Sequence, residues 1–224
     1  MIPQNKLNEL KALRCKIQAC RDCDLRQHYD KPVACAGSPI AEVMFIGEAP
    51  GAEETEQGKP FVGASGQMLR TAILDAGLDL ENVFITNVLC CRPLGNTFPS
   101  DVSYIKACRH WLYEQMLFIR PKIIVSVGGQ AHKHIRESDI GITKACGKWE
   151  EHVFSLYSGH KPNTEMSYRA WYMATLHPSF CMRGPDTRYA NPVMELDRQG
   201  KENLLKKHIA SIPQQLQIIK GGQI

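Results

Sequence analysis

The sequence predicts an α/β fold, a three-layer sandwich in which a central, mainly parallel sheet of four strands is flanked by helices. Short apolar, β-prone runs alternate along the chain with longer segments of helical periodicity. The first of these runs stops abruptly at a carboxylate and a glycine- and proline-rich loop, in Val43-Met-Phe-Ile-Gly-Glu-Ala-Pro-Gly51. Such alternation is typical of parallel strands joined by crossover helices that cover both faces of the sheet.

The elements follow in order along the chain. An opening helix is predicted by apolar residues at helical spacing, namely Leu7, Leu10, Leu13 and Ile17. Strands are expected near 42–47, 83–89, 122–127 and 171–175, and helices near 65–77, 101–118, 129–137 and 197–211. Ser65 and Asp101 are the expected N-caps of two of these helices.

Two segments do not follow this alternation. Residues 146–172 combine apolar residues typical of a hairpin strand with a polar stretch, Ser158-Gly-His-Lys-Pro-Asn-Thr164, and we interpret them as a surface excursion. Residues 214–224, which contain a Gly-Gly pair, are expected to form a partly loose C-terminal tail. The remaining residues, 1–213, are predicted to form a single domain.

Composition narrows the class of protein. The 224 residues carry a formal net charge of +4, which permits nucleic-acid binding through a local patch but does not by itself indicate it. No apolar run approaches a membrane span and the N-terminus lacks the apolar core of a signal peptide, so we expect a cytoplasmic protein without membrane association. In a reducing compartment, nine cysteines are better explained by metal binding than by disulfides.

Four cysteines have the spacing of a metal site. Cys20 and Cys23 form a CxxC pair, and Cys91 and Cys108 stand at the two ends of a loop and helix. Thiolates suit both tetrahedral zinc and a 4Fe-4S cluster, and spacing alone does not choose between them. The alternative is a set of unrelated buried thiols. Cys90 would point to the opposite face of its strand from Cys91, and we expect Cys91 to be the ligand.

Four side chains are expected at one edge of the sheet, where parallel strands end and ligands of open α/β folds bind. They are Glu48, Phe61, Asn87 and His177. An aromatic ring, an amide, an imidazole and a carboxylate together suit a pocket the size of a nucleobase. Singly, each has a simpler explanation: a turn cap for Glu48, core packing for Phe61, a turn residue for Asn87 and a strand-end histidine for His177.

The ordered motifs resemble those of the family-four, iron-sulfur uracil-DNA glycosylases. The matching segments are Cys20-x-x-Cys23, Gly47-Glu-Ala-Pro-Gly51, Gly58-x-Pro-Phe-Val-Gly63, Thr86-Asn-Val88, Cys91-Arg-Pro93, Cys108 and His177-Pro-Ser179. They cover most of the chain and occur in the family's order, which makes a chance match improbable.

The resemblance implies a monomeric DNA-repair enzyme of a bacterium, an archaeon or a phage. It would flip uracil out of single- or double-stranded DNA and hydrolyse the N-glycosidic bond, leaving an abasic site. A mainly structural 4Fe-4S cluster would be held by Cys20, Cys23, Cys91 and Cys108. Around the base, the resemblance implies a stacking role for Phe61, recognition of the base edge by Asn87, and further contacts from Gly47, Ala49, Gly51 and Glu54.

The roles that the resemblance implies for the catalytic residues follow from the charges that develop when the N-glycosidic bond breaks. Glu48 would position or activate the attacking water and favour the cationic sugar, and His177, as a neutral donor, would bind the base O2 as negative charge collects there. DNA contacts are expected from Pro178, Ser179 and Arg183 in the His177–Arg183 loop, where an apolar wedge could fill the space left by the flipped base. Surface lysines and arginines, namely Lys59, Arg188 and Lys201, are further candidates for phosphate contact.

Departures from the family pattern keep other functions open. The Cys91–Cys108 spacing is one residue longer than expected, Leu94-Gly-Asn-Thr-Phe98 replaces a Pro- and Arg-containing loop, and Thr55 replaces an acidic residue. Gly51 offers no wall to a C5 substituent unless Glu54 supplies one. A glycosylase for a modified or hypermodified pyrimidine is therefore the second hypothesis. A non-catalytic iron-sulfur DNA-binding protein is the third, and the presence of Glu48, Asn87 and His177 argues against it.

Overall fold

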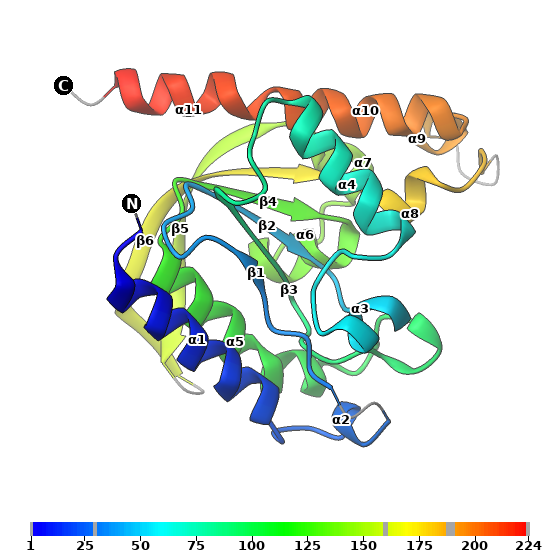
Figure 1. Ribbon diagram of the computed structural model, residues 1–224. Coiled ribbons are helices and arrows are strands. Elements are labelled where there is room, and N and C mark those ends of the chain that lie inside the picture. The colour runs from blue at the N-terminus through cyan, green and yellow to red at the C-terminus, as the bar shows by residue number, and fades with distance from the viewer. Residues whose placement is uncertain (1, 29–30, 159–160, 187–190, 223–224) are drawn as a thin grey trace.

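The computed structural model describes residues 2–28, 31–158, 161–186 and 191–222. In that part of the chain a six-stranded sheet with the strand order β1-β3-β2-β4-β6-β5 lies between two layers of helices (Figure 1). The strands are β1 (Ala36–Gly37), β2 (Val43–Gly47), β3 (Val83–Asn87), β4 (Ile123–Val127), β5 (Trp149–Ser158) and β6 (Lys161–Thr175). The three-layer α/β class is as predicted.

The helices connect these strands on both faces of the sheet. The longer ones are α1 (Gln4–Ala19), α4 (Ala64–Asp75), α5 (Val102–Ile119), α6 (Gly129–Arg136), α10 (Arg198–Ala210) and α11 (Ile212–Gly221). The short ones are α2 (Leu25–His28), α3 (Ala52–Gln57), the 3-10 turn η1 (Leu94–Asn96), α7 (Ile142–Ala145), α8 (Pro178–Cys181) and α9 (Pro192–Glu195).

The four inner strands are parallel, in the order β3-β2-β4-β6. Every residue of β2, β3 and β4 is buried, as expected for strands covered on both faces. The register pairs Gly47 with Asn87 and Val127 with Thr175, so the carboxyl ends of all four strands meet at one edge of the sheet. That edge is where the sequence predicted a site.

Alternate residues of each strand face two separate cores. Met44 and Ile46 of β2 pack with α1, α5 and α6, whereas Val43 and Phe45 pack with α4 and α10. This alternation is the direct consequence of the two-residue period of a strand. The sheet is thereby fixed between its two helix layers, and the loops that follow β2, β3, β4 and β6 start from a rigid frame.

The sheet has two strands more than the four predicted. β1 pairs antiparallel with β3, and β5 pairs antiparallel with β6 from Trp149, opposite Met173, onward. The segment interpreted as a surface excursion is therefore largely an edge hairpin of the sheet. Its Phe154 is buried in the core beside α5, which is why the hairpin is held against the domain.

Helix boundaries confirm one predicted cap and correct another. Asp101 caps α5, and its carboxylate accepts the Ser103 N–H at 2.8 Å. Ser65 does not cap α4, because the helix begins one residue earlier, with Gly63 at the N-cap position. Ser65 lies instead in the wall of a cavity described below.

Most of the expected C-terminal tail is helical. α11 continues from Ile212 to Gly221, with Ile212 buried and Leu216 and Ile219 packed against the same core. These apolar residues recur at helical spacing, and burial of that face outweighs the local effect of the Gly-Gly pair. The expectation of a loose segment is wrong for the residues up to Gly221.

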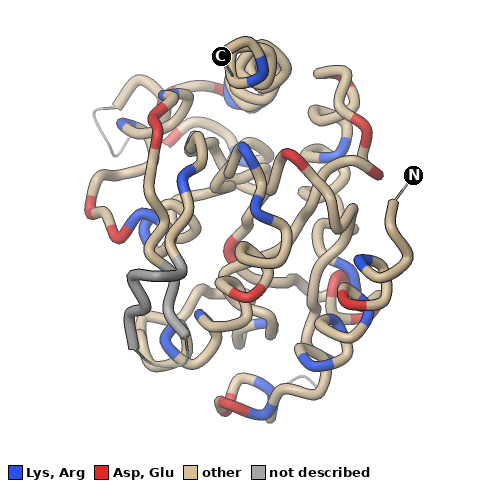
Figure 2. Tube along the Cα trace, turned by 90° about the vertical axis from the view of Figure 1, so that its left-hand side faces the viewer, with Lys and Arg blue, Asp and Glu red and all other residues tan. Residues whose placement is uncertain are grey.

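Charge is distributed without a dominant sign. Figure 2 shows lysine and arginine interspersed with aspartate and glutamate along the trace. Within the described residues, no helix is both long enough and apolar enough to cross a membrane.

Candidate active site

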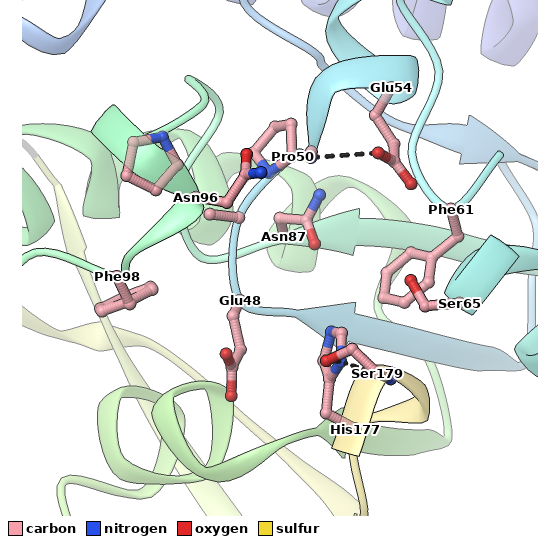
Figure 3. A pocket seen from close by; sticks show the side chains of 13 residues that line it. Glu48, Pro50, Glu54, Phe61, Ser65, Asn87, Asn96, Phe98, His177 and Ser179 are labelled. Carbon is pink, nitrogen blue, oxygen red and sulfur yellow. Dashed lines mark hydrogen bonds between the residues drawn. The ribbon is translucent and has the colours of Figure 1, made fainter. Parts of the chain in front are cut away.

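A cavity of about 270 Å³ opens at the carboxyl ends of β2 and β3 (Figure 3). Glu48 follows β2, Asn87 ends β3 and His177 follows β6, so three strands deliver one polar side chain each. The lining residues are Glu48, Ala49, Pro50, Gly51, Glu54, Phe61, Ser65, Asn87, Pro93, Asn96, Phe98, His177 and Ser179. Eight residues predicted for the site from the sequence are therefore brought to one cavity.

Glu48 lies at the N-terminus of α6. Its Oε1 accepts the Gln130 backbone N–H at 3.0 Å, and the partial positive charge of the helix end favours the carboxylate form. Gly128 has a φ of 104°, and a side chain there would collide with Glu48 Oε1 and approach His177. Gly128, which follows β4, therefore makes room for both polar groups, and the sequence reasoning missed it.

Opposing effects act on the pKa of Glu48. Burial is the larger and raises the pKa of this carboxyl above its usual value. The backbone N–H groups of Gln130 and Gly129 and the charge of Arg183 lower the pKa and offset part of the rise. Glu48 is thus a partly buried carboxyl group whose proton affinity is higher than that of an exposed glutamate.

His177 is oriented through its Nδ1 atom. The Ser179 backbone N–H donates to Nδ1 at 3.1 Å, and the Ser179 hydroxyl lies 2.7 Å from the same atom. Since Nδ1 accepts a hydrogen bond from the Ser179 backbone N–H, the neutral ring carries its proton on Nε2. Although the ring is partly open to the cavity, the surrounding protein and Arg183 lower the His177 pKa to about 4. The imidazole is therefore neutral near pH 7 and has an N–H to donate.

Phe61 stands in the left-handed region, with a φ of 54°, and its ring is buried in the cavity wall. The Arg70 guanidinium holds this conformation by donating to the carbonyls of Phe61 at 2.8 Å and Pro60 at 3.1 Å. Gly66 permits the close approach, because a side chain there would collide with the Phe61 backbone. The Phe61 ring lies 6.1 Å from the His177 ring and at 35° to it, so the two rings border the same space.

Asn87 and Phe61 converge on the end of β2. A side chain at Gly47 would collide with both Asn87 Oδ1 and the Phe61 ring, so this glycine lets them pack directly over the strand. Figure 3 shows the Asn87 amide directed toward the cavity. Among the described residues the amide has no hydrogen-bond partner, although Asn87 is buried. It is available to a ligand.

Glu54 fills the space beside Gly51. Its carboxylate accepts the backbone N–H groups of Gly51 at 3.1 Å and Gly63 at 3.3 Å, and a Cβ on Gly51 would lie 2.7 Å from Oε2. Thr55 is buried, and its hydroxyl donates to the Gly51 carbonyl at 2.9 Å. Glu54 therefore forms the cavity wall at the position where Gly51 has no side chain. The Thr55 hydrogen bond stabilises the turn at Gly51.

The loop that follows Cys91 forms the remaining wall, through Pro93, Asn96 and Phe98. Asn96 has a φ of 56° and accepts from Arg92 Nε at 2.7 Å, and the Phe98 ring stacks on His134 at a centroid distance of 5.6 Å. These residues were not assigned to the site from the sequence. The sequence signals were the Cys91-Arg-Pro93 motif for Pro93 and the altered composition of the following loop for Asn96 and Phe98.

The predicted DNA-contact loop lies next to the cavity. Ser179 lines the cavity, Pro178 is buried beneath it, and Arg183 is exposed beside it, close enough to lower the pKa of both Glu48 and His177. Lys59 is exposed, whereas Lys201 is fully buried, so its assignment to a phosphate-binding surface is wrong. Arg188 lies outside the described residues.

The four cysteines expected to hold a metal lie near one another. The charges of Cys108, Cys23 and Cys20, together with burial as the larger cause, raise the pKa of Cys91 to about 12. Cys108 Sγ accepts the Cys90 backbone N–H at 3.2 Å, and the hydrogen bonds from Cys90 lower the pKa of Cys108. Across the described residues, no three side chains of His, Cys, Asp or Glu converge closely enough to hold a single metal ion.

Comparisons with known proteins show the family of this chain. A family model described as the uracil DNA glycosylase superfamily matches residues 36–198. The chain is 34% identical to a type-4 uracil-DNA glycosylase of Saccharolobus solfataricus over 91% of this chain and 90% of that protein. It is 41% identical to one from Sulfurisphaera tokodaii, over 63% of this chain and 66% of that protein, and 30% identical to one from Thermotoga maritima, over 86% and 92%.

Proposed function

Because the chain belongs to the uracil DNA glycosylase superfamily, and within it to the type-4 uracil-DNA glycosylases, we propose that it removes uracil from DNA by hydrolysis and leaves an abasic site. One observation carries the proposal. A partly buried carboxylate, Glu48, and a neutral imidazole donor, His177, border a base-sized cavity that also holds an aromatic ring and an amide without a hydrogen-bond partner among the described residues.

The cavity requires that the base leave the DNA helix. Phe61 lies in the cavity wall and Asn87 is buried at the end of β3, so neither can reach a base that is still stacked in a duplex. Extrusion of the nucleotide costs a few kcal/mol, of the order expected for an unstacked and unpaired base. Stacking on Phe61 and hydrogen bonds to Asn87 offset that cost.

Glu48 acts on the sugar side of the bond. Cleavage between N1 and C1′ leaves an oxocarbenium-like sugar and a pyrimidine anion. A carboxylate held by the Gln130 N–H favours the cationic sugar, and its free lone pairs orient a water toward C1′. The raised pKa of Glu48 also makes it a stronger base toward that water.

His177 acts on the base side. Its Nε2–H donates to O2 of the uracil as negative charge collects on the pyrimidine, and the Ser179 backbone N–H at Nδ1 keeps the ring in that tautomer. Among the described residues that line the cavity, none is a lysine that could form a Schiff base with the sugar. We therefore assign hydrolysis without cleavage of the DNA strand.

Asn87 and Glu54 account for the choice of base. An amide can donate to O4 of uracil and accept from N3–H, whereas cytosine presents the reverse pattern at those positions. The Glu54 carboxylate fills the space beside Gly51, so a bulky C5 substituent would meet a charged group there. Both features favour uracil over a hypermodified pyrimidine.

A panel of oligonucleotides tests this function. Strands carrying uracil, cytosine, hypoxanthine or a C5-hydroxymethyl pyrimidine are incubated with the protein and scored for abasic sites. We expect excision of uracil at a rate at least 10⁴-fold, as an order of magnitude, above that of cytosine, because the wrong base leaves buried polar groups unpaired. Faster release of the C5-modified base than of uracil would instead support the modified-pyrimidine hypothesis, and release of none would support a DNA-binding role.

We also assign a 4Fe-4S cluster to Cys20, Cys23, Cys91 and Cys108. The donor set supports this assignment: burial and the neighbouring thiols raise the pKa of Cys91, burial and Cys108 raise the pKa of Cys23, and bound iron would favour the thiolate forms. Cys20, Cys23, Cys91 and Cys108 would each supply one thiolate ligand to the cluster. The bound cluster would supply a structural cross-link between the segment after α1 and the start of α5.

The cluster assignment predicts a coloured protein. Anaerobically purified material should be brown, with broad absorbance near roughly 400 nm from sulfur-to-iron charge transfer, and should contain about four irons per chain. The variant Cys108→Ser should lose most of this absorbance, while Cys15→Ser, at an exposed cysteine, should retain it. A colourless wild-type protein that contains zinc would contradict the assignment.

A further inference from the structure

A fully buried lysine, Lys201, lies beneath the DNA-contact loop. It belongs to the first turn of α10, and none of its surface is exposed. Lysine is almost never buried unless its charge is compensated, because removing an ammonium ion from water is expensive. The groups that contact the Lys201 ammonium ion therefore indicate the role of this residue.

The ammonium group binds the end of the His177–Arg183 loop. Lys201 Nζ donates to the carbonyl oxygens of Gly184 at 2.7 Å and Arg183 at 3.3 Å, and lies 4.3 Å from the centroid of the Phe180 ring. In the part of the chain that the structure describes, no carboxylate forms an ion pair with it. Two backbone carbonyls and one aromatic face therefore stabilise the ammonium charge.

A second contact joins the same two segments. Cys181 is completely buried, and its thiol donates to the Lys201 carbonyl at 3.5 Å. α8 and α10 are thus linked through both the side chain and the backbone of Lys201. The segment from Phe180 to Gly184 is held against α10 rather than left as a free loop.

The two ends of the loop are held differently. His177, at the start, is oriented by the Ser179 N–H and hydroxyl, which belong to the loop itself. Arg183, at the other end, is exposed and has its guanidinium 5.6 Å from the Phe180 ring, while its carbonyl is bound by Lys201. Loss of the Lys201 side chain would therefore remove contacts that hold Arg183 and Phe180 against α10 and leave those of His177 in place.

We propose that Lys201 is a positioning residue that fixes Phe180 and Arg183 for opening duplex DNA. This proposal rests on the proposed function. Phe180 and Arg183 would stabilise a duplex from which a nucleotide has been extruded, one through apolar contact and the other through phosphate. A single strand needs little such help, because its bases are already unstacked and unpaired.

The test compares one uracil in two contexts. Single-turnover excision is measured for Lys201→Met with uracil opposite adenine in a duplex and with the same strand alone. Methionine keeps the apolar volume but not the charge or the donors. We expect about a tenfold loss on the duplex, in line with two lost charge-assisted hydrogen bonds, and less than about a twofold loss on the single strand.

Lys206→Met is the matched control. Lys206 lies on the same helix, but its side chain is partly exposed and, among the described residues, forms surface ion pairs with Asp75 and Glu202, so both rates should stay within about twofold of wild type. Equal losses of Lys201→Met on the two substrates would overturn the proposal, since a purely structural defect lowers the active fraction for both. Unchanged duplex activity would overturn it as well.

A second variant covers the case in which Lys201→Met does not fold. Phe180→Leu keeps an apolar side chain but removes the ring that faces the ammonium group, and should give a smaller, duplex-selective loss. Equal losses on both substrates with this variant would again contradict the proposal. The proposed function is tested separately, because its failure would appear as wild-type protein that releases uracil from neither substrate.

Discussion

Replacement of Glu48 by glutamine is expected to lower the single-turnover rate of uracil excision by about 10²- to 10⁴-fold, the range of a positioned general base. Glutamine keeps the size of the side chain but neither activates water nor favours a cationic sugar. The measurement is the release of uracil from an oligonucleotide with enzyme in excess. Glu53→Gln is the matched control, because Glu53 lies nearby on α3 but does not line the cavity, and its rate should match wild type.

The pH profile tests the same residue independently. The pKa of Glu48 is raised by burial, so its carboxylate is complete above that raised pKa and is lost as the pH falls through it. The His177 pKa of about 4 keeps the imidazole neutral throughout this range. We therefore expect excision by the wild type to fall on the acid side at a pH above the ordinary glutamate pKa. The Glu48→Gln variant should lack this acid limb, and an unchanged limb would assign it to another group.

Replacement of His177 by alanine is expected to reduce the excision rate by about 10²- to 10³-fold, as found when one donor to a developing oxyanion is removed. The loss should appear in kcat more than in KM, because the bond to O2 strengthens as charge collects there. His177→Gln, which keeps an N–H donor, should recover part of the rate. Wild-type activity in His177→Ala would show that base departure is stabilised elsewhere.

The acid limb of the pH–rate profile distinguishes the role of Glu48 from that of His177. In His177→Ala the remaining activity should keep the pH dependence of the wild type, because Glu48 still titrates. A shift of that limb would show that His177 and Glu48 titrate as a coupled pair. The two substitutions together should not be additive if both groups act in the same transition state.

The parallel core could be predicted because it depends on local pattern. The segments that form β2, β3 and β4 are mostly apolar and are followed by turn residues. This pattern is typical of strands that are buried on both faces. The edge hairpin was harder to predict. β5 and β6 mix exposed and buried positions, and only the packing of Phe154 against the domain indicates that they extend the sheet.

Some residues of the site could likewise be predicted from the sequence, and others could not. The motif residues Glu48, Asn87 and His177 follow strands whose order along the chain is visible, so a shared edge could be inferred before their positions were known. Arg70, Gly128 and Lys201 could not be found this way. Each acts through a contact in space that hydrophobic periodicity does not show: with the Phe61 backbone, with the Glu48 carboxylate and with the carbonyls of the loop after β6.

The sequence by itself determined the α/β class, the parallel strands and the groups expected at their ends, because hydrophobic periodicity and turn chemistry are local properties. Only the tertiary structure determined the pKa values and contacts of those groups. The low pKa of His177 and the raised pKa of Glu48 depend on burial by other segments, and Glu48 also accepts a backbone N–H from α6. Such effects act over a few ångströms in space, and only the fold sets those distances.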